Sequence, residues 1–211
     1  PVIVVANEFF DALPIRQFVK GNAGWHERLV GLKDGRRSFG LAPMPIPDEA
    51  VPPSLRSAAP GEVYEVSLAG ADVMQRLGTA VARLGGAILA IDYGYPDTRP
   101  GETLQAVRGH AYADPLATPG MADLSAHVDF GALARVATGV GLTAQPLATQ
   151  GDFLRQLGIV ERAAALSTAN PQQAGAIDAA RDRLTGSGQM GELFKVFCAA
   201  SPGLEPPGFV P

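Results

Sequence analysis

Five polar residues stand directly after two apolar runs, where they are well placed to bind a ligand and act on it. They are Asn7, Glu8, Asp11, Asp92 and Tyr93. Carboxylates accept N–H hydrogen bonds and pair with cations, so Glu8 and Asp11 are suited to hold a positively charged group. In open α/β sheets, ligands bind beyond the carboxyl ends of the strands. If the two runs are neighbouring strands, these side chains share one crevice. The competing roles for them are helix capping, turn formation and surface charge.

Two predicted strands must position these residues. Residues 1–6 (PVIVVA) form a near-continuous β-branched run, typical of a strand buried on both faces in the middle of a parallel sheet. Residues 87–91 form a second buried strand, which follows a predicted helix with apolar residues at helical spacing over 73–84. This order predicts an α/β fold. Because a buried central strand rarely opens a domain, we expect its partners on one side to come from sequence before residue 1.

The segment between these strands breaks the α/β rhythm. Asp34-Gly35 is a strong hairpin-turn signal, and the runs 25–32 and 37–41 on either side of it predict two strands. A proline-rich, irregular stretch follows, and residues 62–67 are typical of an edge strand. We therefore predict a hairpin-rich subdomain over residues 13–67, inserted into a domain made of residues 1–12 and 68–211.

Several local signals mark further elements in the second half of the chain. Asp129 is a predicted N-cap of a helix, and Thr149 with Asp152 forms a predicted capping box before another. The remaining predicted elements are a helix opened by Asn170-Pro171 and strands at 142–147 and 193–199.

Composition limits the classes of function. The 211 residues carry a net charge of −4, which argues against a nucleic-acid partner because phosphate binding favours a surplus of Lys and Arg. No apolar stretch approaches the roughly 18 to 20 residues of a membrane span. The single cysteine, Cys198, cannot form an intrachain disulfide, and it lies in an apolar run typical of the core. His26, His110 and His127 show no metal-ligand spacing, so no metal site is predicted.

A glycine motif that resembles a dinucleotide site stands in the wrong context. Residues 186–191 (GSGQMG) fit the pattern GxGxxG, but they follow a predicted helix and precede a predicted strand. A cofactor phosphate needs the reverse order, with the N-terminus of a helix after the glycines. This disfavours a nucleotide-dependent oxidoreductase, one of the alternatives for such a sheet.

Eight segments in order resemble the MidA-like S-adenosyl-L-methionine (AdoMet)-dependent methyltransferases, whose mitochondrial relatives are the complex I assembly arginine methyltransferases. They are residues 6–14, 25–30, 86–94, 101–108, 110–116 with 119–120, 123–130, 149–154 and 190–196. Ser125 stands where threonine is expected, a mild departure. The resemblance implies a class I (Rossmann-like) methyltransferase sheet of which this chain holds strands four to seven, the last of them antiparallel. It places the glycine-rich AdoMet loop and the first three strands before residue 1, so we expect this chain alone to be inactive.

The resemblance also implies roles for the polar residues. Glu8 is expected to pair with a guanidinium, Asp11 to assist or orient it, and Asn7 to lie close to the transferred methyl group of AdoMet. The expected substrate-pocket residues are Asp92, Tyr93 and His127. The implied partner is a protein substrate, with a respiratory-complex subunit as one candidate, and the implied location is a bacterial cytoplasm or the mitochondrial matrix. Oligomeric state stays open, a homodimer included.

Two further alternatives remain at this point. One is a non-catalytic methyltransferase-like module that binds or assembles proteins. The other is a fragment that folds only with its missing half, in which case residues 2–5 would form an open apolar edge prone to pairing.

Overall fold

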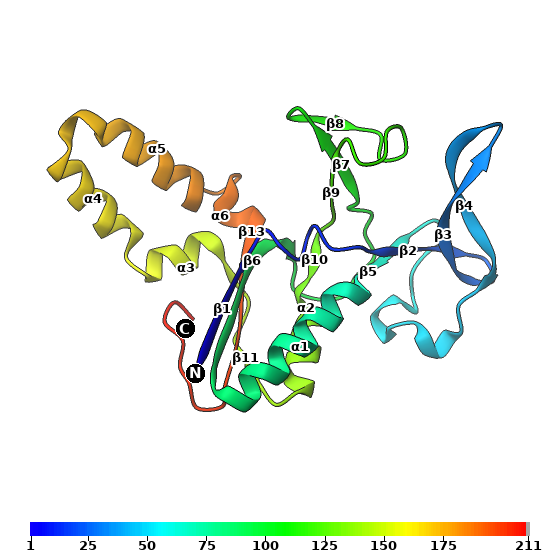
Figure 1. The fold of residues 1–211 in the computed structure, drawn as a ribbon, viewed down its shortest axis with the longest axis horizontal. Helices are drawn as coiled ribbons and strands as arrows, with labels where there is room; N and C mark the ends of the chain where they lie inside the picture. The colour runs from blue at the N-terminus through cyan, green and yellow to red at the C-terminus, as the bar shows by residue number, and fades with distance from the viewer. Residues whose placement is uncertain (210–211) are drawn as a thin grey trace.

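A small mixed sheet lies at the centre of the chain in the computed structural model, which describes residues 1–209 (Figure 1). Strand β1 (Val2–Asn7) pairs in parallel with β6 (Gly86–Tyr95), from Val2 opposite Gly86 to Asn7 opposite Ile91. Strand β13 (Phe194–Ala200) runs antiparallel on the other side of β6. Three short strands complete the sheet: β10 (Val128–Asp129) beside β6, and β11 (Thr143–Ala144) and β12 (Ala148–Thr149) beside β13. The predicted strand at 142–147 is thus only partly formed.

Two helices cover one face of this sheet. They are α1 (Leu68–Leu84) and α2 (Phe130–Gly139), and their apolar side chains pack on Ala6, Ile88, Ala90, Phe197 and Ala199. The predicted cap of α2 is confirmed, because the Asp129 side chain accepts the N–H of Ala132. The packed central sheet therefore supports the loops at its carboxyl edge.

The opposite face of the sheet is buried at β13 and exposed at β1. Val196 and Cys198 are fully buried there, whereas Ile3 is 80% exposed and Val5 61% exposed. The strand prediction for residues 1–6 is correct, but burial on both faces is wrong for the described residues. The physical reason is that helix α3 (Gln150–Gln156) contacts β12 and β13 and does not extend over β1.

A second sheet forms from the region predicted to be an insertion. Its order is β4-β3-β2-β5, with all neighbours antiparallel. The bounds are β2 (Arg16–Gly21), β3 (Gly24–Lys33), β4 (Arg36–Pro45) and β5 (Val63–Val66), with short 3-10 turns η1 (Asp48–Ala50) and η2 (Pro53–Leu55). The predicted turn is confirmed, because Asp34 and Gly35 both have positive φ, and β5 is an edge strand as expected. The sheet has its own core, built from Phe18, Trp25, Val51, Leu55 and Tyr64.

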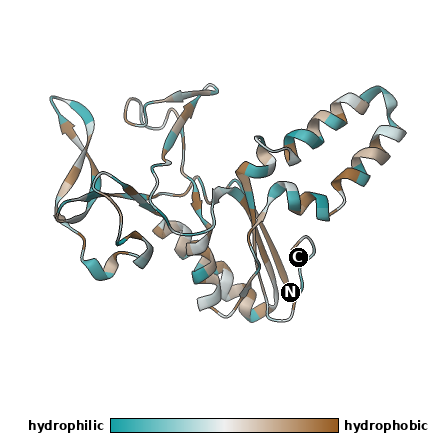
Figure 2. Cartoon of the chain, turned by 180° about the vertical axis from the view of Figure 1, so that it is seen from behind, coloured by the Kyte–Doolittle hydropathy of each residue, from teal (hydrophilic) through white to brown (hydrophobic). Residues whose placement is uncertain are grey.

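Two projections complete the molecule, and neither was fully predicted. One is a three-stranded sheet of order β8-β7-β9, made of β7 (Gln105–Arg108), β8 (Ala111–Ala113) and β9 (Asp123–Ser125). The other is an arm of α4 (Ile159–Ala169), η3 (Pro171–Gln173), α5 (Ala174–Thr185) and α6 (Met190–Leu193), with α4 absent from the predicted elements. Figure 2 shows mixed hydropathy along this arm, in contrast to the apolar central strands. None of the described helices is long and apolar enough to cross a membrane.

Gly86 allows β1 to lie against the start of β6, which gives a testable expectation. It has φ 128°, and a Cβ built on it would lie 1.8 Å from the carbonyl oxygen of Val2. We expect Gly86→Ala to lower the free energy of unfolding by about 2–4 kcal/mol, because backbone must move and the new residue is strained. Urea denaturation measures this. The control is Gly139→Ala, where a Cβ meets nothing within 4 Å, and equal effects of the two changes would contradict the argument.

Candidate functional site

A buried carboxylate holds the loop that follows β1. Asp92 is fully buried, and its Oδ2 accepts the backbone N–H groups of Phe9, Phe10 and Asp11 at 3.2, 3.1 and 3.2 Å. Its Oδ1 accepts the N–H of Tyr93 at 3.0 Å. A single side chain therefore fixes three consecutive peptide groups of the loop, which would otherwise leave buried donors without partners.

This placement corrects the prediction for Asp92. The sequence placed it after the second strand, facing a substrate pocket. In the structure β6 continues through Asp92 to Tyr95, because β10 pairs with its last residues. Asp92 thus lies inside the strand, beneath the loop and out of contact with solvent. Its carboxylate positions other residues.

Asp11 and Tyr93 form the next layer of the site. The Tyr93 hydroxyl donates to Asp11 Oδ2, and burial raises the pKa of this phenol further above its ordinary value, so it is a neutral donor. Asp11 is 8% exposed, and its Oδ1 is buried with no hydrogen-bond partner among residues 1–209. A buried acceptor without a partner carries a desolvation cost unless a ligand or water satisfies it.

His127 lies against this pair. Its ring meets that of Tyr93 edge to face, with centroids 5.4 Å apart, and its backbone N–H donates to Thr103 Oγ1 at 2.8 Å. Burial lowers the pKa of His127, and the nearby charges of Arg99 and Lys195 lower it as well, against an opposing effect of Glu65. The imidazole is therefore neutral near pH 7 and can act as donor or acceptor.

Sequence reasoning missed Glu65, a second buried carboxylate in this region. It is 3% exposed and accepts the Gln17 side chain at 2.7 Å and the N–H groups of Thr103 and Leu104 at 3.0 and 3.1 Å. The Thr103 hydroxyl that holds His127 also donates to it. Glu65 thus links the second sheet to residues 103–104 and, through the Thr103 hydroxyl, to the backbone of His127. The only sequence signal was a charged residue inside the apolar run 63–66.

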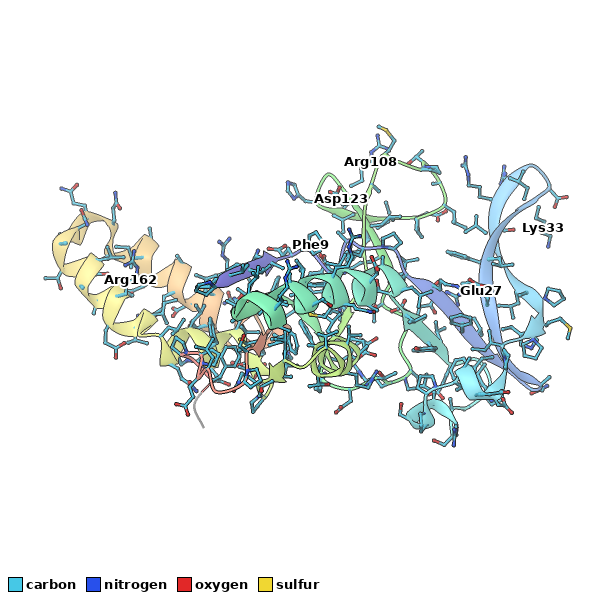
Figure 3. The ribbon with its side chains drawn as sticks, turned by 60° about the horizontal axis from the view of Figure 1, so that its bottom comes forward. Phe9, Glu27, Lys33, Arg108, Asp123 and Arg162 are labelled. Carbon is cyan, nitrogen blue, oxygen red and sulfur yellow. The ribbon has the colours of Figure 1, made fainter. Side chains whose placement is uncertain are left out.

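Asn7 and Glu8 lie on the surface at the end of β1. Both are exposed, and the Asn7 side chain amide donates to Glu8 Oε1 at 3.4 Å. Glu8 has φ 47°, a left-handed conformation that glutamate rarely adopts, while its N–H donates to Ile91 at 3.0 Å. Such strain persists where surrounding structure enforces it, and it is concentrated at functional sites. Phe9, 42% exposed, is beside it, in the position labelled in Figure 3.

The structure therefore divides the predicted residues into two groups. Asp11, Tyr93 and His127 form one connected cluster above Asp92, and Asn7 and Glu8 stand at the surface of the same strand end. No cluster of three His, Cys, Asp or Glu able to hold a metal occurs among residues 1–209. Cys198 is buried away from the site, and burial raises the pKa of its thiol to about 11, so it is a core residue.

The arrangement has the features of a ligand site at the carboxyl ends of two parallel strands. Residues 1–147 match a family model described as "Putative S-adenosyl-L-methionine-dependent methyltransferase". The chain belongs to this family. The resemblance to MidA-like methyltransferases drawn from the eight segments is thereby confirmed.

Solved structures show the same fold in this family. A crystal structure from Burkholderia thailandensis with S-adenosyl-homocysteine bound superimposes with a TM-score of 0.85 at 30% identity, covering 99% of this chain and 54% of that chain. A second crystal structure from the same organism, described as native, gives a TM-score of 0.84 at 30% identity, covering 99% of this chain and 56% of that one.

Curated relatives are named as mitochondrial enzymes. The protein arginine methyltransferase NDUFAF7 of Danio rerio is 34% identical over 199 residues, 92% of this chain and 46% of the relative. The Homo sapiens protein of that name is 33% identical over 198 residues, 92% and 44% respectively. The chain thus spans about half the length of the curated relatives it matches.

The buried position of Asp92 gives a pH dependence that can be measured. Burial, and then the charge of Asp11, raise the pKa of Asp92 from 3.8 to about 7. Between these values the folded state binds a proton that the unfolded state has lost. The free energy of unfolding should therefore fall as pH rises from about 4 to about 7, by up to about 1.4 kcal/mol per pH unit. Urea titrations across this range should show a shallower slope for Asp92→Asn, and an unchanged slope would contradict the assignment.

Proposed function

We propose that the complete protein transfers a methyl group from AdoMet to an arginine side chain of a protein substrate. The observation that carries the proposal is the strained, exposed carboxylate of Glu8 at the end of β1, above the buried Asp92 anchor. It is supported by family membership and by the bound S-adenosyl-homocysteine of the structural neighbour. Because this chain spans about half of its relatives, activity is proposed for the complete protein and this chain alone is expected to be inactive.

The sheet supports a finer assignment within the class I methyltransferase fold. We assign β1 and β6 as the fourth and fifth strands, β11 with β12 as the sixth and β13 as the seventh. The order β1-β6-β13-β11, with β13 antiparallel between its neighbours, is the pattern that this assignment requires. The separate sheet and core of β2 to β5 support residues 13–67 as an inserted subdomain on the substrate side, within a domain of residues 1–12 and 68–211.

The residues present fit the reactive end of AdoMet. That end is a sulfonium cation, and the exposed Asn7 amide and Glu8 carboxylate provide a polar, negatively charged surface at the carboxyl edge of the sheet. When bound, AdoMet supplies an electrophilic methyl group. We assign Asn7 to the surface beside that methyl group.

The difficulty of methylating arginine is the high pKa of its guanidinium, above 12, which makes it a poor nucleophile. A carboxylate that accepts two of its N–H groups fixes the plane of the group and draws positive charge away from the attacking nitrogen. In our proposal Glu8 makes this pair. Asp11, whose Oδ1 has no partner among the described residues, accepts a further N–H, while Tyr93 holds its Oδ2. His127 borders the pocket through its contact with Tyr93.

A non-catalytic role in protein binding is the second candidate. It is favoured by the apolar side chains exposed on the β3–β4 hairpin, among them Val30 at 58% and Leu32 at 78%. Exposed apolar patches of this kind are typical of protein interfaces. Such a module would bind its protein partner without AdoMet.

Substrate and location are proposed from the relatives. The names of the curated relatives give a mitochondrial location, and for this protein we propose the mitochondrial matrix or a bacterial cytoplasm. A respiratory-complex subunit is the proposed substrate. Binding to nucleic acid is not expected at a net charge of −4.

Calorimetric titration of S-adenosyl-homocysteine tests the proposal directly. We expect the complete gene product to bind it and the 211-residue chain not to bind. Methyl transfer from labelled AdoMet to arginine-containing peptides is the second measurement. A complete product that binds no S-adenosyl-homocysteine would overturn the methyltransferase proposal and favour the protein-binding module.

A further inference from the structure

An open cleft of about 710 Å³ lies beside the candidate site, at the carboxyl end of β6. Its lining includes Gly94 of β6, His127, Arg99, Arg183 and Lys195. The cleft thus shares His127 with the catalytic cluster and extends from it toward the helical arm, because Arg183 belongs to α5 and Lys195 to β13. A ligand group that entered the cleft would lie next to whatever occupies the site of Asp11 and Tyr93.

The charge of this cleft is positive. Arg99, Arg183 and Lys195 line it together with one carboxylate, Glu192. None of these three cations forms an ion pair with a carboxylate within residues 1–209. The ion pairs among these residues involve other arginines, such as Arg181 with Asp178 at 3.0 Å. Lys195 donates only to the carbonyl of Glu192, and the Arg99 guanidinium lies over the Tyr95 ring at 5.1 Å.

Two of these cations also affect His127 in the candidate site. Arg99 lies in the loop after β6 and Lys195 in β13, and both are close enough to His127 to lower its pKa. Lys195 is half-buried, and this burial lowers the pKa of its ammonium. Arg99 and Arg183 are exposed, so partial desolvation applies to Lys195 alone, and this ammonium gains more from an anionic partner than a fully solvated cation does.

We propose that this cleft binds an acidic side chain of the protein substrate, close in sequence or space to the methyl-accepting arginine. The inference rests on the proposed function for the identity of the acceptor. Three cations that line one cleft without ion pairs suit a carboxylate, which accepts several charge-assisted hydrogen bonds at once. The cleft then selects substrates in which a glutamate or aspartate accompanies the arginine, and it sets the direction in which the substrate chain crosses the site.

The test uses a set of short fluorescent peptides, each with one central arginine in a neutral sequence and a single glutamate moved along the chain. Matched peptides carry glutamine at the same positions. Anisotropy measures affinity for the complete protein in the presence of S-adenosyl-homocysteine, and a labelled-methyl assay measures kcat/KM on the same peptides. At one or two positions we expect glutamate to improve affinity about tenfold over glutamine, and added salt should weaken this advantage.

Charge-reversal variants test whether the cleft causes the preference for glutamate. Arg183→Glu should reduce the glutamate advantage to less than about twofold, and Arg99→Glu, at a second lining position, should do the same. The matched control is Arg162→Glu, an exposed arginine on α4 outside the cleft (Figure 3), which should keep the advantage. Thermal denaturation verifies that each variant is folded, and two independent wall positions keep the test valid should one variant not fold.

The outcomes separate this inference from the proposed function. Methyl transfer without any preference for glutamate, or binding of no peptide at all, overturns the acidic subsite. A glutamate preference that disappears in Arg183→Glu while no peptide is methylated supports the subsite and overturns arginine methylation. Loss of S-adenosyl-homocysteine affinity in Arg183→Glu equal to the loss of peptide affinity assigns the cations to the cofactor and also overturns the subsite.

Discussion

Replacing Asp92 by alanine should lower the free energy of unfolding by about 3–5 kcal/mol and abolish methyl transfer. The carboxylate is fully buried and accepts four backbone N–H groups, three of them from consecutive loop residues. Its removal leaves buried donors without partners and a cavity beneath the loop, and both effects are costly. Since Glu8 precedes these residues directly and Asp11 is one of them, the loop should lose the geometry that the site needs. Urea denaturation and a labelled-methyl assay on the complete protein measure the two effects.

A surface aspartate provides the control for Asp92. Asp72 on α1 has a side chain that is 66% exposed and pairs only with Arg76 at 3.6 Å. Asp72→Ala should therefore change the free energy of unfolding by less than about 0.5 kcal/mol. Asp92→Asn should be intermediate in stability. Its amide oxygen can still accept some of the backbone N–H groups, whereas its NH₂ group cannot accept the others. Wild-type stability and activity in Asp92→Ala would show that the loop is held by other contacts.

Glu8→Gln should lower kcat for arginine methylation by about 100-fold or more while leaving stability unchanged. Glutamine keeps the size and one acceptor but loses the charge that pairs with a guanidinium, and loss of one such electrostatic contact typically costs this much in rate. Glu8 is exposed, and its side chain accepts only from Asn7, so little of the folding energy depends on it. Single-turnover transfer from labelled AdoMet and thermal denaturation measure the two quantities.

Two further variants separate catalysis from backbone strain at this position. Glu8→Gly should be as inactive as Glu8→Gln but no less stable, because glycine adopts φ near 47° without strain. Glu205→Gln changes an exposed carboxylate near the C-terminal end of the described chain and should retain wild-type kcat. A Glu8→Gln enzyme that methylates at the wild-type rate removes Glu8 from catalysis.

These variants separate contributions to stability from contributions to activity within one loop. Asp92 should affect stability and activity together, because it holds the backbone. Glu8 should affect activity alone, because it stands on the surface that the backbone presents. The pH slope assigned to Asp92 gives a third, independent readout of the anchor.

Local physical signals determined much of the fold from the sequence alone. The β-branched run of β1, the Asp34-Gly35 turn and the Asp129 cap act over a few residues, so their patterns are visible without tertiary structure. The resemblance of eight ordered segments determined the family, and with it the expected roles of Glu8 and Asp11 toward a guanidinium. Helix α4 escaped prediction because its residues are mostly exposed and show no regular apolar period.

Only the tertiary structure decided what the polar residues do. The sequence places Asp92 and Asp11 81 positions apart, and only the pairing of β1 with β6 brings the Asp92 carboxylate under the N–H groups of the loop. The same holds for Glu65 with Thr103, and for the cleft of Arg99, Arg183 and Lys195, whose members come from three separate segments. Burial, hydrogen-bond partners and charge neighbours depend on contacts between distant residues, so no local pattern in the chain encodes them. The sequence determined which side chains were present at the strand ends, and the packed sheet decided which became anchors and which remained free to meet a substrate.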